Sequence, residues 1–354
     1  PSVASTTQAS PSTAPAATTS TIEMSAQRFD GRGPYGVGVT TISLGDRQTE
    51  IYYPADPAAV AGKPTDSYRT ADVLPEATRS FIPPAMDGTF DVGAVRDAVA
   101  SDKGPFPLII YSQGFGGYLQ VASFQLAHLS SWGFVVASTD HLERGLVALT
   151  TGNLGQAGSG QDVIDVTNTI AALRAENERK GGPLEGRVDA EHIGISGHSA
   201  GAQTSLRSAG SNTDIDAFVS ISGGLSLMGE PSPDVPSKPA LVVAADKDKV
   251  VAADKSSALY EALGTQKYWV EIANAGHNSF TDSCPSILAR GGLESMRPLL
   301  GALVDLAQDG CTEGMTDPLL VQSVLNHYTT AFFLTYLGVQ DARDRKSTRL
   351  NSSH

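Results

Sequence analysis

The feature that most restricts the fold is a series of short, mostly apolar segments in which polar and apolar residues do not alternate. They are FPLIIY at 106–111, FVVAS at 134–138, HIGIS at 192–196, AFVSIS at 217–222, ALVVAA at 240–245 and YWVEIA at 268–273. Continuous apolar strands are typical of a parallel sheet that is covered on both faces. Because longer stretches with apolar residues at helical spacing separate these strands, the sequence predicts an α/β fold with a mostly parallel central sheet and helices on both faces.

The remaining elements complete this prediction. An antiparallel hairpin is expected at residues 41–44 and 50–53, turning at Gly45-Asp46. Helices are expected at 117–131, 161–179, 253–263, 293–306 and 318–337. Two stretches, 70–103 and 142–160, interrupt the alternation. The second follows the carboxyl end of a strand, where α/β folds place their working loops, so we expect both insertions near the functional site.

The two ends of the chain differ from its middle in composition. Residues 1–28 are mainly Ser, Thr, Ala and Pro and contain too little apolar surface to offset chain entropy, so we expect a disordered tether. Such a tether is typical of an exported protein, either secreted or attached to the cell surface. Residues 29–340 are expected to form one catalytic domain. Residues 341–354 are basic and polar and are interpreted as a non-native tail.

The chain has two cysteines, Cys284 and Cys311. In an exported protein they predict one disulfide, and two free thiols are the alternative. A bridge across a loop of this size contributes about 3 kcal/mol in the chain-entropy model. Neither cysteine lies in a C-x-x-C motif or near clustered histidines, so no metal site is expected.

The net charge of −13 argues against nucleic acid and anionic membranes as partners. No apolar run reaches the length of about 20 residues that spans a bilayer, so no integral membrane segment is expected. The glycines at 114, 116 and 117 lack the rest of a dinucleotide fingerprint, and we expect no cofactor. We expect a monomer.

Ser199 lies in the pentapeptide Gly197-His198-Ser199-Ala200-Gly201, directly after the HIGIS strand. A G-x-S-x-G sequence at a strand-to-helix turn holds a serine hydroxyl exposed as a nucleophile. The alternative is a glycine-rich loop with a helix-capping serine.

Two further loops carry the groups that would activate this serine. Asp246 and Asp248 follow the ALVVAA strand, and His277 follows the YWVEIA strand. Because the carboxyl ends of parallel strands meet at one edge of a sheet, the order serine, acid, histidine predicts a catalytic triad. His277 would act as the base and an aspartate would orient it. We favour Asp248, since it lies further beyond the strand end, and Asp246 remains the alternative.

The oxyanion that forms during such catalysis needs backbone donors. We expect them to be the N–H groups of Ala200 and of Phe115, the latter in the glycine-rich loop after the FPLIIY strand. Gly114 and Gly116 would let the backbone approach the substrate closely. His198 and His141 are expected to border the substrate pocket, with Glu143 near its rim.

The segments that carry these residues resemble bacterial α/β-hydrolases of the platelet-activating-factor acetylhydrolase and cutinase/polyesterase group. They are FPLIIYSQGFGG, SSWGFVVASTDH, VDAEHIGISGHSAG, AADKDKVV and NAGHNSFTDSC, and the resemblance runs from Gly33 to Cys284. It implies an α/β-hydrolase fold, the triad Ser199, Asp248 and His277, and hydrolysis of carboxylic esters. The polyesterases commonly carry an aromatic residue before the nucleophile and Met after it, where this chain has His198 and Ala200.

The sequence therefore predicts a serine carboxylic-ester hydrolase that acts on small to medium esters or lipid esters through an acyl-enzyme. The alternatives are a polyester or cutin-type hydrolase, an acyltransferase, and a non-catalytic binding protein with a hydrolase fold.

Overall fold

The computed structural model describes residues 28–82, 87–154, 160–227, 234–264 and 266–338. The tether expected at 1–28 lies outside these residues except for Arg28, and so does the tail expected at 341–354.

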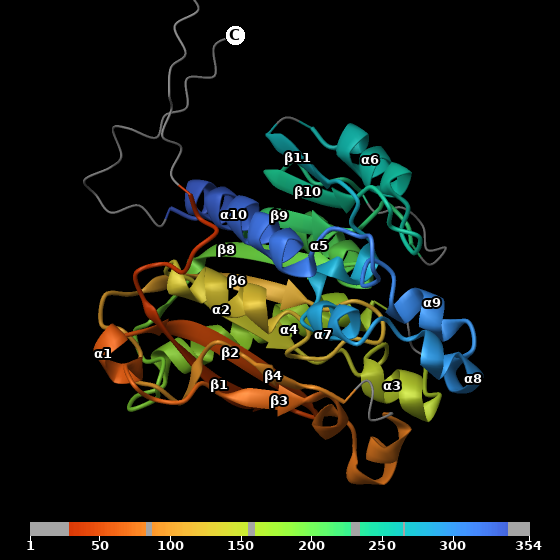
Figure 1. Cartoon of the computed structure of the whole chain (residues 1–354). Helices are drawn as coiled ribbons and strands as arrows, with labels where there is room; N and C mark the ends of the chain where they lie inside the picture. Colours follow the sequence, from red (N-terminus) through yellow and green to blue (C-terminus); the bar gives the residue numbers. More distant parts are fainter. Residues whose placement is uncertain (1–27, 83–86, 155–159, 228–233, 265, 339–354) are drawn as a thin grey trace, which may run out of the picture.

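The described residues form a nine-stranded sheet with the strand order β11-β10-β9-β8-β6-β7-β2-β1-β5 (Figure 1). Six neighbouring strands, β7, β6, β8, β9, β10 and β11, are parallel to one another. Strands β1 and β2 form an antiparallel hairpin, and β2 pairs antiparallel with β7. The bounds are β1 Gly36–Leu44, β2 Arg47–Ala55, β5 Val95–Arg96, β6 Phe106–Ser112, β7 Val135–Thr139, β8 Val188–His198, β9 Ile215–Ile221, β10 Ala240–Ala245 and β11 Lys267–Ile272. The mostly parallel sheet and the opening hairpin are thus confirmed.

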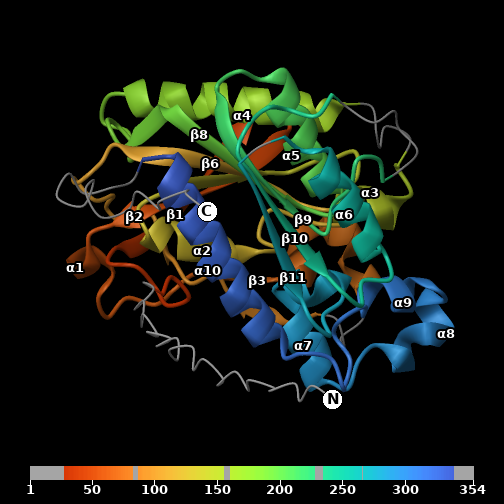
Figure 2. The same ribbon diagram turned by 90° about the horizontal axis from the view of Figure 1, so that it is seen from above.

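Helices cover both faces of this sheet (Figure 2). Helices α2 (Ser123–Ser131) and α10 (Pro318–Tyr336) bury Leu126 and Phe333 against one face. Helices α4 (Gln161–Glu178), α5 (Ala200–Ser211) and α6 (Ala253–Ala262) pack side chains such as Ile170 and Leu206 against the other. Strands β6, β7, β9 and β10 are buried on both sides, which explains their continuous apolar sequences, whereas the edge strand β11 is only partly buried.

Two expected helices are wrong in extent. The helix expected from residue 117 begins only at Ser123, where the Asp282 carboxylate accepts hydrogen bonds from the N–H groups of Ser123 and Phe124. This cap is supplied from a distant loop and satisfies donors that the start of a helix leaves free. The helix expected at 293–306 is divided into η4 (Glu294–Met296), α8 (Arg297–Leu300) and α9 (Leu303–Ala307). The division lies at Gly301, whose φ of 56° is incompatible with a right-handed helix.

The two insertions lie against each other. Residues 70–82 contain the 3-10 helices η1 (Thr70–Val73) and η2 (Glu76–Phe81), and residues 142–160 contain the unexpected helix α3 (Leu146–Thr151). Leu74 and Ile82 pack with Leu146 and Val147 in a small apolar cluster. The remaining short elements are α1 (Pro57–Val60), which packs on β1, and β3 (Ser67–Arg69) paired with β4 (Thr89–Asp91).

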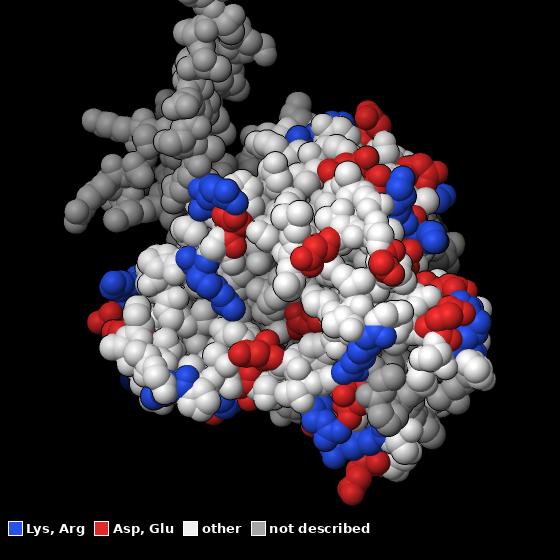
Figure 3. All heavy atoms as spheres, viewed as in Figure 1, with Lys and Arg blue, Asp and Glu red and all other residues white. Residues whose placement is uncertain are grey.

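Cys284 and Cys311 form a disulfide, as expected, which joins α7 (Ser283–Ala289) to the segment after α9. None of the helices in the described ranges has the length and apolarity that crossing a membrane requires. On the face seen in Figure 3, acidic and basic side chains are interspersed and separated by uncharged surface.

Candidate active site

Ser199 occupies a sharp turn between the last residue of β8 and the first residue of α5. Its φ of 57° and ψ of −121° are unfavourable for a residue with a side chain, and such strain is found where function requires it. A Cβ atom at Gly201 would lie 1.9 Å from the carbonyl oxygen of Ser112, and one at Gly197 would lie 2.1 Å from that of Gly201. Both flanking positions therefore require glycine, because the strand and the helix approach too closely for any side chain.

His277 begins the 3-10 helix η3 (His277–Phe280) after β11, and its Nδ1 lies 2.8 Å from Oδ2 of Asp248. The other carboxylate oxygen of Asp248 accepts hydrogen bonds from the N–H groups of Val250 and Val251, at 2.9 and 2.7 Å. Asp246 instead lies 3.4 Å from the Lys247 ammonium. Of the two aspartates considered from the sequence, the fold brings Asp248 to the imidazole.

The surroundings of Asp248 favour its charged form. Burial by itself would raise the pKa of the carboxyl. The hydrogen bond from His277, the charge of that ring and the N–H of Val251 outweigh burial, so the pKa of Asp248 lies below its ordinary value. A carboxylate held in this state can keep an Nδ1–H donor in place and stabilise an imidazolium.

His198 links the histidine loop to the serine turn. Its ring centroid lies 4.6 Å from that of His277, and its Nε2 lies 3.0 Å from the His277 carbonyl oxygen. Burial, assisted by the charge of His277, lowers the pKa of His198 to about 3, so the ring is neutral and its Nε2–H donates to that carbonyl. His198 thus packs against His277, directly beside Ser199 in the chain, and only 5% of its surface is exposed.

The glycine-rich loop after β6 also lies against Ser199. A Cβ atom at Gly114 would lie 3.1 Å from Cβ of Ser199 and 3.2 Å from the carbonyl oxygen of His198. In the part of the chain that the structure describes, the N–H groups of Phe115 and Ala200 have no hydrogen-bond acceptor. Two unpaired backbone donors close to a serine are what an oxyanion requires.

A buried arginine that we did not anticipate supports this loop. One terminal nitrogen of Arg144 donates to Ser112 Oγ and to the Gln113 carbonyl, both at 2.9 Å, and the other pairs with Asp162. The Arg144 carbonyl in turn accepts the N–H of Gly116 at 2.7 Å. The only signal for this role in the sequence is a charged residue within a glycine- and threonine-rich stretch that follows a strand.

His141, which we expected to border the substrate pocket, contacts Ser112 and Asp165. It is buried, with Nε2 2.9 Å from Ser112 Oγ and Nδ1 3.1 Å from Asp165 Oδ2. Burial and the nearby Arg144 charge lower the pKa of His141. Because one ring nitrogen lies against Ser112 and the other against Asp165, His141 links the start of the glycine-rich loop to α4. Gly116, by contrast, lies on the α3 side of that loop, where an added Cβ would contact Leu149.

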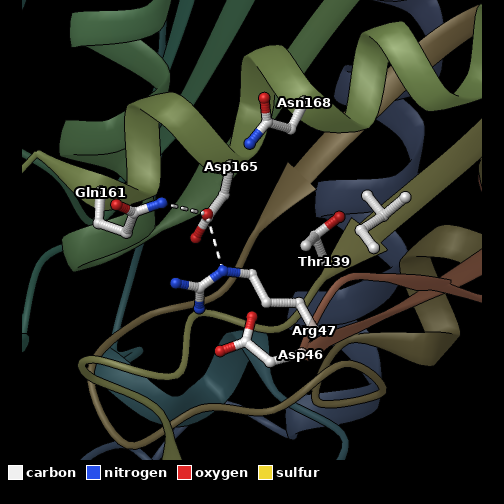
Figure 4. Close-up of a pocket in the computed structure, with 7 residues that line it drawn as sticks. Asp46, Arg47, Thr139, Gln161, Asp165 and Asn168 are labelled. Carbon is white, nitrogen blue, oxygen red and sulfur yellow. Dashed lines mark hydrogen bonds and ion pairs between the residues drawn. The ribbon is translucent and has the colours of Figure 1, made fainter.

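A cavity of about 210 Å³ lies elsewhere, between β2, β7 and α4 (Figure 4). Its polar wall includes Arg47, which pairs with Asp165 and with Glu143. None of Ser199, Asp248 and His277 lines it, so it is separate from the serine site. Glu143, which we expected near the pocket rim, belongs to this ion-pair group.

Within the described ranges, no group of three or more His, Cys, Asp or Glu side chains could hold a metal ion.

The family model for PET hydrolase-like proteins matches residues 59–301. The chain is 28% identical over 194 residues to a bis(hydroxyethyl) terephthalate hydrolase of Streptomyces coelicolor, and the alignment covers 54% of this chain and 56% of that protein. The chain thus spans little more than half the length of that relative. It is 22% identical over 362 residues to a platelet-activating factor acetylhydrolase of Cavia porcellus, covering 89% of this chain and 79% of that one.

The fold is also similar to a solved structure, a ferulic acid esterase of Streptomyces cinnamoneus. The TM-score is 0.60 at 22% identity, over 91% of this chain and 94% of the esterase. The expected resemblance is thereby confirmed, since the family match extends over more than half of the chain. The chain has an α/β-hydrolase fold and belongs to the PET hydrolase-like family.

Proposed function

We propose that the chain is a serine carboxylic-ester hydrolase that works through an acyl-enzyme. Membership of the PET hydrolase-like family and relatives named as hydrolases and as an esterase support ester hydrolysis. The observation that carries the proposal is the buried pair of His277 and Asp248 beside a strained serine turn.

In this mechanism Ser199 Oγ attacks the ester carbonyl carbon while His277 Nε2 accepts the hydroxyl proton. Asp248 holds the Nδ1–H side of the ring and stabilises the imidazolium that forms. The N–H groups of Phe115 and Ala200 donate to the carbonyl oxygen as it becomes negative. His277 then gives its proton to the departing alcohol, which leaves Ser199 acylated. Water then attacks the acyl carbon while His277 accepts its proton, and His277 returns that proton to Ser199 Oγ as the acyl–oxygen bond breaks and the acid leaves.

The proposed substrates are small to medium carboxylic esters or lipid esters. A polyester or its soluble fragments is the second candidate, and the family match and the terephthalate-ester relative favour it. A panel separates the two: p-nitrophenyl esters of increasing chain length, bis(hydroxyethyl) terephthalate, a feruloyl ester, an acetylated phospholipid and a polyester film. Faster release from the film than from soluble esters would favour the second candidate. Addition of an acceptor alcohol would reveal an acyltransferase as a transesterified product.

The first experiment is active-site labelling. A fluorophosphonate should add one covalent label, located at Ser199 by mass spectrometry, and Ser199→Ala should remove both the label and ester hydrolysis. An unlabelled wild-type protein without esterase activity would instead support the non-catalytic binding protein.

The roles of the two aspartates are separated by a matched pair of variants. Asp248→Asn should lower kcat by about 10⁴-fold, because the amide no longer stabilises the imidazolium or its correct tautomer. Asp246→Asn, two positions earlier in the same loop, should stay within about threefold of wild type, since Asp246 is only partly buried and losing its ion pair with the exposed Lys247 costs little. Equal losses in the two variants would contradict the assignment of Asp248.

We further propose that the protein is exported and acts as a monomer without nucleic-acid partners. The Cys284–Cys311 disulfide supports an oxidising compartment, and the net charge of −13 disfavours phosphate backbones. Fractionation of the producing cells and size-exclusion chromatography with light scattering test these points.

A further inference from the structure

Asp309 joins the loop of the proposed catalytic acid to the loop of the proposed base. Its Oδ2 accepts hydrogen bonds from the N–H of His277 at 2.9 Å and from the N–H of Lys249 at 3.0 Å. Its carbonyl oxygen accepts the N–H of Asn278 at 2.8 Å. The residue is buried, with 6% of its surface exposed. One carboxylate oxygen thus holds the backbone of His277 and the backbone directly after Asp248.

The segment around Asp309 is itself held against the histidine loop. Gly276 and Gly310 are in backbone contact, because a Cβ atom at Gly276 would lie 2.5 Å from the Gly310 nitrogen. Ser279 Oγ donates to the Gly310 carbonyl at 3.2 Å. Cys311, two residues after Asp309, forms the disulfide with Cys284, which follows η3. The position of Asp309 is therefore determined on both sides by contacts to the loop that it supports.

The relative position of the two loops matters because proton transfer depends on the orientation of the imidazole. Nearer to the strands, the Lys247 N–H donates to the Ala275 carbonyl at 2.9 Å. Beyond that bond, Asp248 and His277 contact each other only through side chains, whose separation depends on the distance between the two backbones. The Asp309 carboxylate holds both backbones at this level, one residue after the acid and at the base itself.

We propose that Asp309 is a positioning residue for the triad: it sets the orientation of His277 relative to Asp248, and the Cys284–Cys311 disulfide keeps it in place. The inference rests on the proposed function of Ser199, Asp248 and His277. Asp309 touches neither substrate nor reacting atoms and acts only through the backbone of the two loops.

Three variants test this role. Asp309→Ala removes the acceptor. Asp309→Asn is the conservative variant, because its carbonyl oxygen still accepts both N–H groups. The matched control is Asp305→Ala, which removes an exposed carboxylate of α9 whose partner is Arg297. The readouts are kcat and KM on a soluble ester, and the low-field proton NMR resonance of the hydrogen bond between His277 Nδ1 and Asp248.

Asp309→Ala is expected to lower kcat by about 10- to 100-fold with KM changed by less than about threefold, since small displacements of reacting groups have effects of this size. Its low-field resonance should broaden or disappear. Asp309→Asn should restore the resonance and most of kcat, and Asp305→Ala should behave as wild type. A purely structural role would lower the melting temperature of Asp309→Ala without changing the resonance of the folded protein.

Wild-type kcat and an unchanged resonance in folded Asp309→Ala would overturn the proposal, and so would an equal loss in Asp309→Asn. If Asp309→Ala does not fold, Asp309→Ser replaces it, because the shorter hydroxyl cannot reach both N–H groups. Failure of the proposed esterase function and failure of the proposed role of Asp309 give different results. Loss of the proposed function would appear as a wild-type protein that neither hydrolyses esters nor takes up the fluorophosphonate, and the resonance would still report on Asp309.

Discussion

At the scale of single residues, burial keeps two of the histidines neutral. Burial lowers the pKa of His198 to about 3 and that of His128 to about 4, so both rings are neutral across the range in which an esterase works. His128 Nε2 lies 2.7 Å from the Phe29 carbonyl, and His198 makes the equivalent contact to His277. These rings act as packed hydrogen-bonding groups, whereas His277 faces a carboxylate. A carboxylate partner alone does not distinguish the proposed base, because the buried His141 also lies against a carboxylate, that of Asp165.

This burial predicts a defined acid sensitivity. An unfolded histidine takes up a proton near pH 6.5 and folded His198 only near pH 3, so the stability that His198 contributes is complete above pH 6.5 and is lost as the pH falls towards 3. Between pH 7 and pH 5 the free energy of unfolding should fall by about 2 kcal/mol from this residue alone. His198→Phe should remove this part of the pH dependence in urea unfolding.

The variant and the wild type are compared by the pH dependence of their stability rather than by its absolute value, because His198→Phe also loses the hydrogen bond to the His277 carbonyl. His192→Gln is the control, since His192 is exposed. Burial raises the pKa of Asp282 to about 7, which makes the protein more stable as the pH falls from 7 towards 4. The contribution of Asp282 to the pH dependence of stability has the opposite sign to that of His198. Because it is the same in the wild type and in both variants, it cancels when their pH dependences are subtracted. A His198→Phe protein with the wild-type pH dependence would contradict the prediction.

At the scale of elements, the contact of β6 with the first turn of α5 determines the serine turn. The helix starts so close to the end of β6 that its second residue, Gly201, lies against the Ser112 carbonyl. Arg144 and His141 both contact the Ser112 hydroxyl at the end of β6, where the glycine-rich loop begins. The strain at Ser199 is thus maintained by packing between elements rather than by the local sequence alone.

The two glycines of α5 should respond differently to alanine. Gly201→Ala places a Cβ atom 1.9 Å from a backbone oxygen, so the helix must move away from β6 and carry Ser199 with it. We expect a loss of kcat of more than about 100-fold, or a destabilisation of about 1–3 kcal/mol. Gly210→Ala, near the end of the same helix, meets only the Asp234 carbonyl at 3.2 Å and should change stability by no more than about 1 kcal/mol in either direction, with kcat unchanged. Equal behaviour of the two variants in kinetics and thermal unfolding would disprove this reading.

At the scale of the whole molecule, the segment that follows the sheet leaves the loop of His277 and returns to it. Residues 283–311 leave η3, form the broken helices α7, α8 and α9, and return to the same loop at Asp309. Their buried side chains form a small apolar cluster of their own around the disulfide, namely Cys284, Ile287, Leu293, Val304 and Cys311. A cluster of this size has little apolar area, so the covalent bond contributes a large share of its stability.

Removal of the disulfide should therefore affect both stability and turnover. The double variant Cys284→Ser/Cys311→Ser should lose about 3 kcal/mol of unfolding free energy, because the bridge restricts the unfolded chain. If the disulfide holds Asp309 in place, kcat should also fall. Reduced wild-type protein should match the double variant in urea unfolding, and the reductant should leave the double variant unchanged. A double variant as stable as the oxidised wild type would contradict the expectation.

The main elements were accessible from the sequence because they depend on local composition. A strand buried on both faces must be apolar throughout, so β6, β7, β9 and β10 were identified to within two residues. One failure arose where a distant group decides, whereas the division of the helix expected at 293–306 lies at the local Gly301. The start of α2 depends on Asp282, more than 150 positions later, and α3 forms within a stretch whose composition favours a loop.

The sequence by itself determined the parallel sheet, the glycines around Ser199 and the order of serine, acid and histidine along the chain. Only the tertiary structure decided that Asp248 rather than Asp246 meets His277, that His141 is buried on Ser112, and that Asp309 holds two loops at once. The physical reason is one of distance. Burial of a strand is a sum over consecutive residues, whereas a hydrogen bond depends on loop paths to within a few tenths of an ångström and on partners that no local pattern encodes.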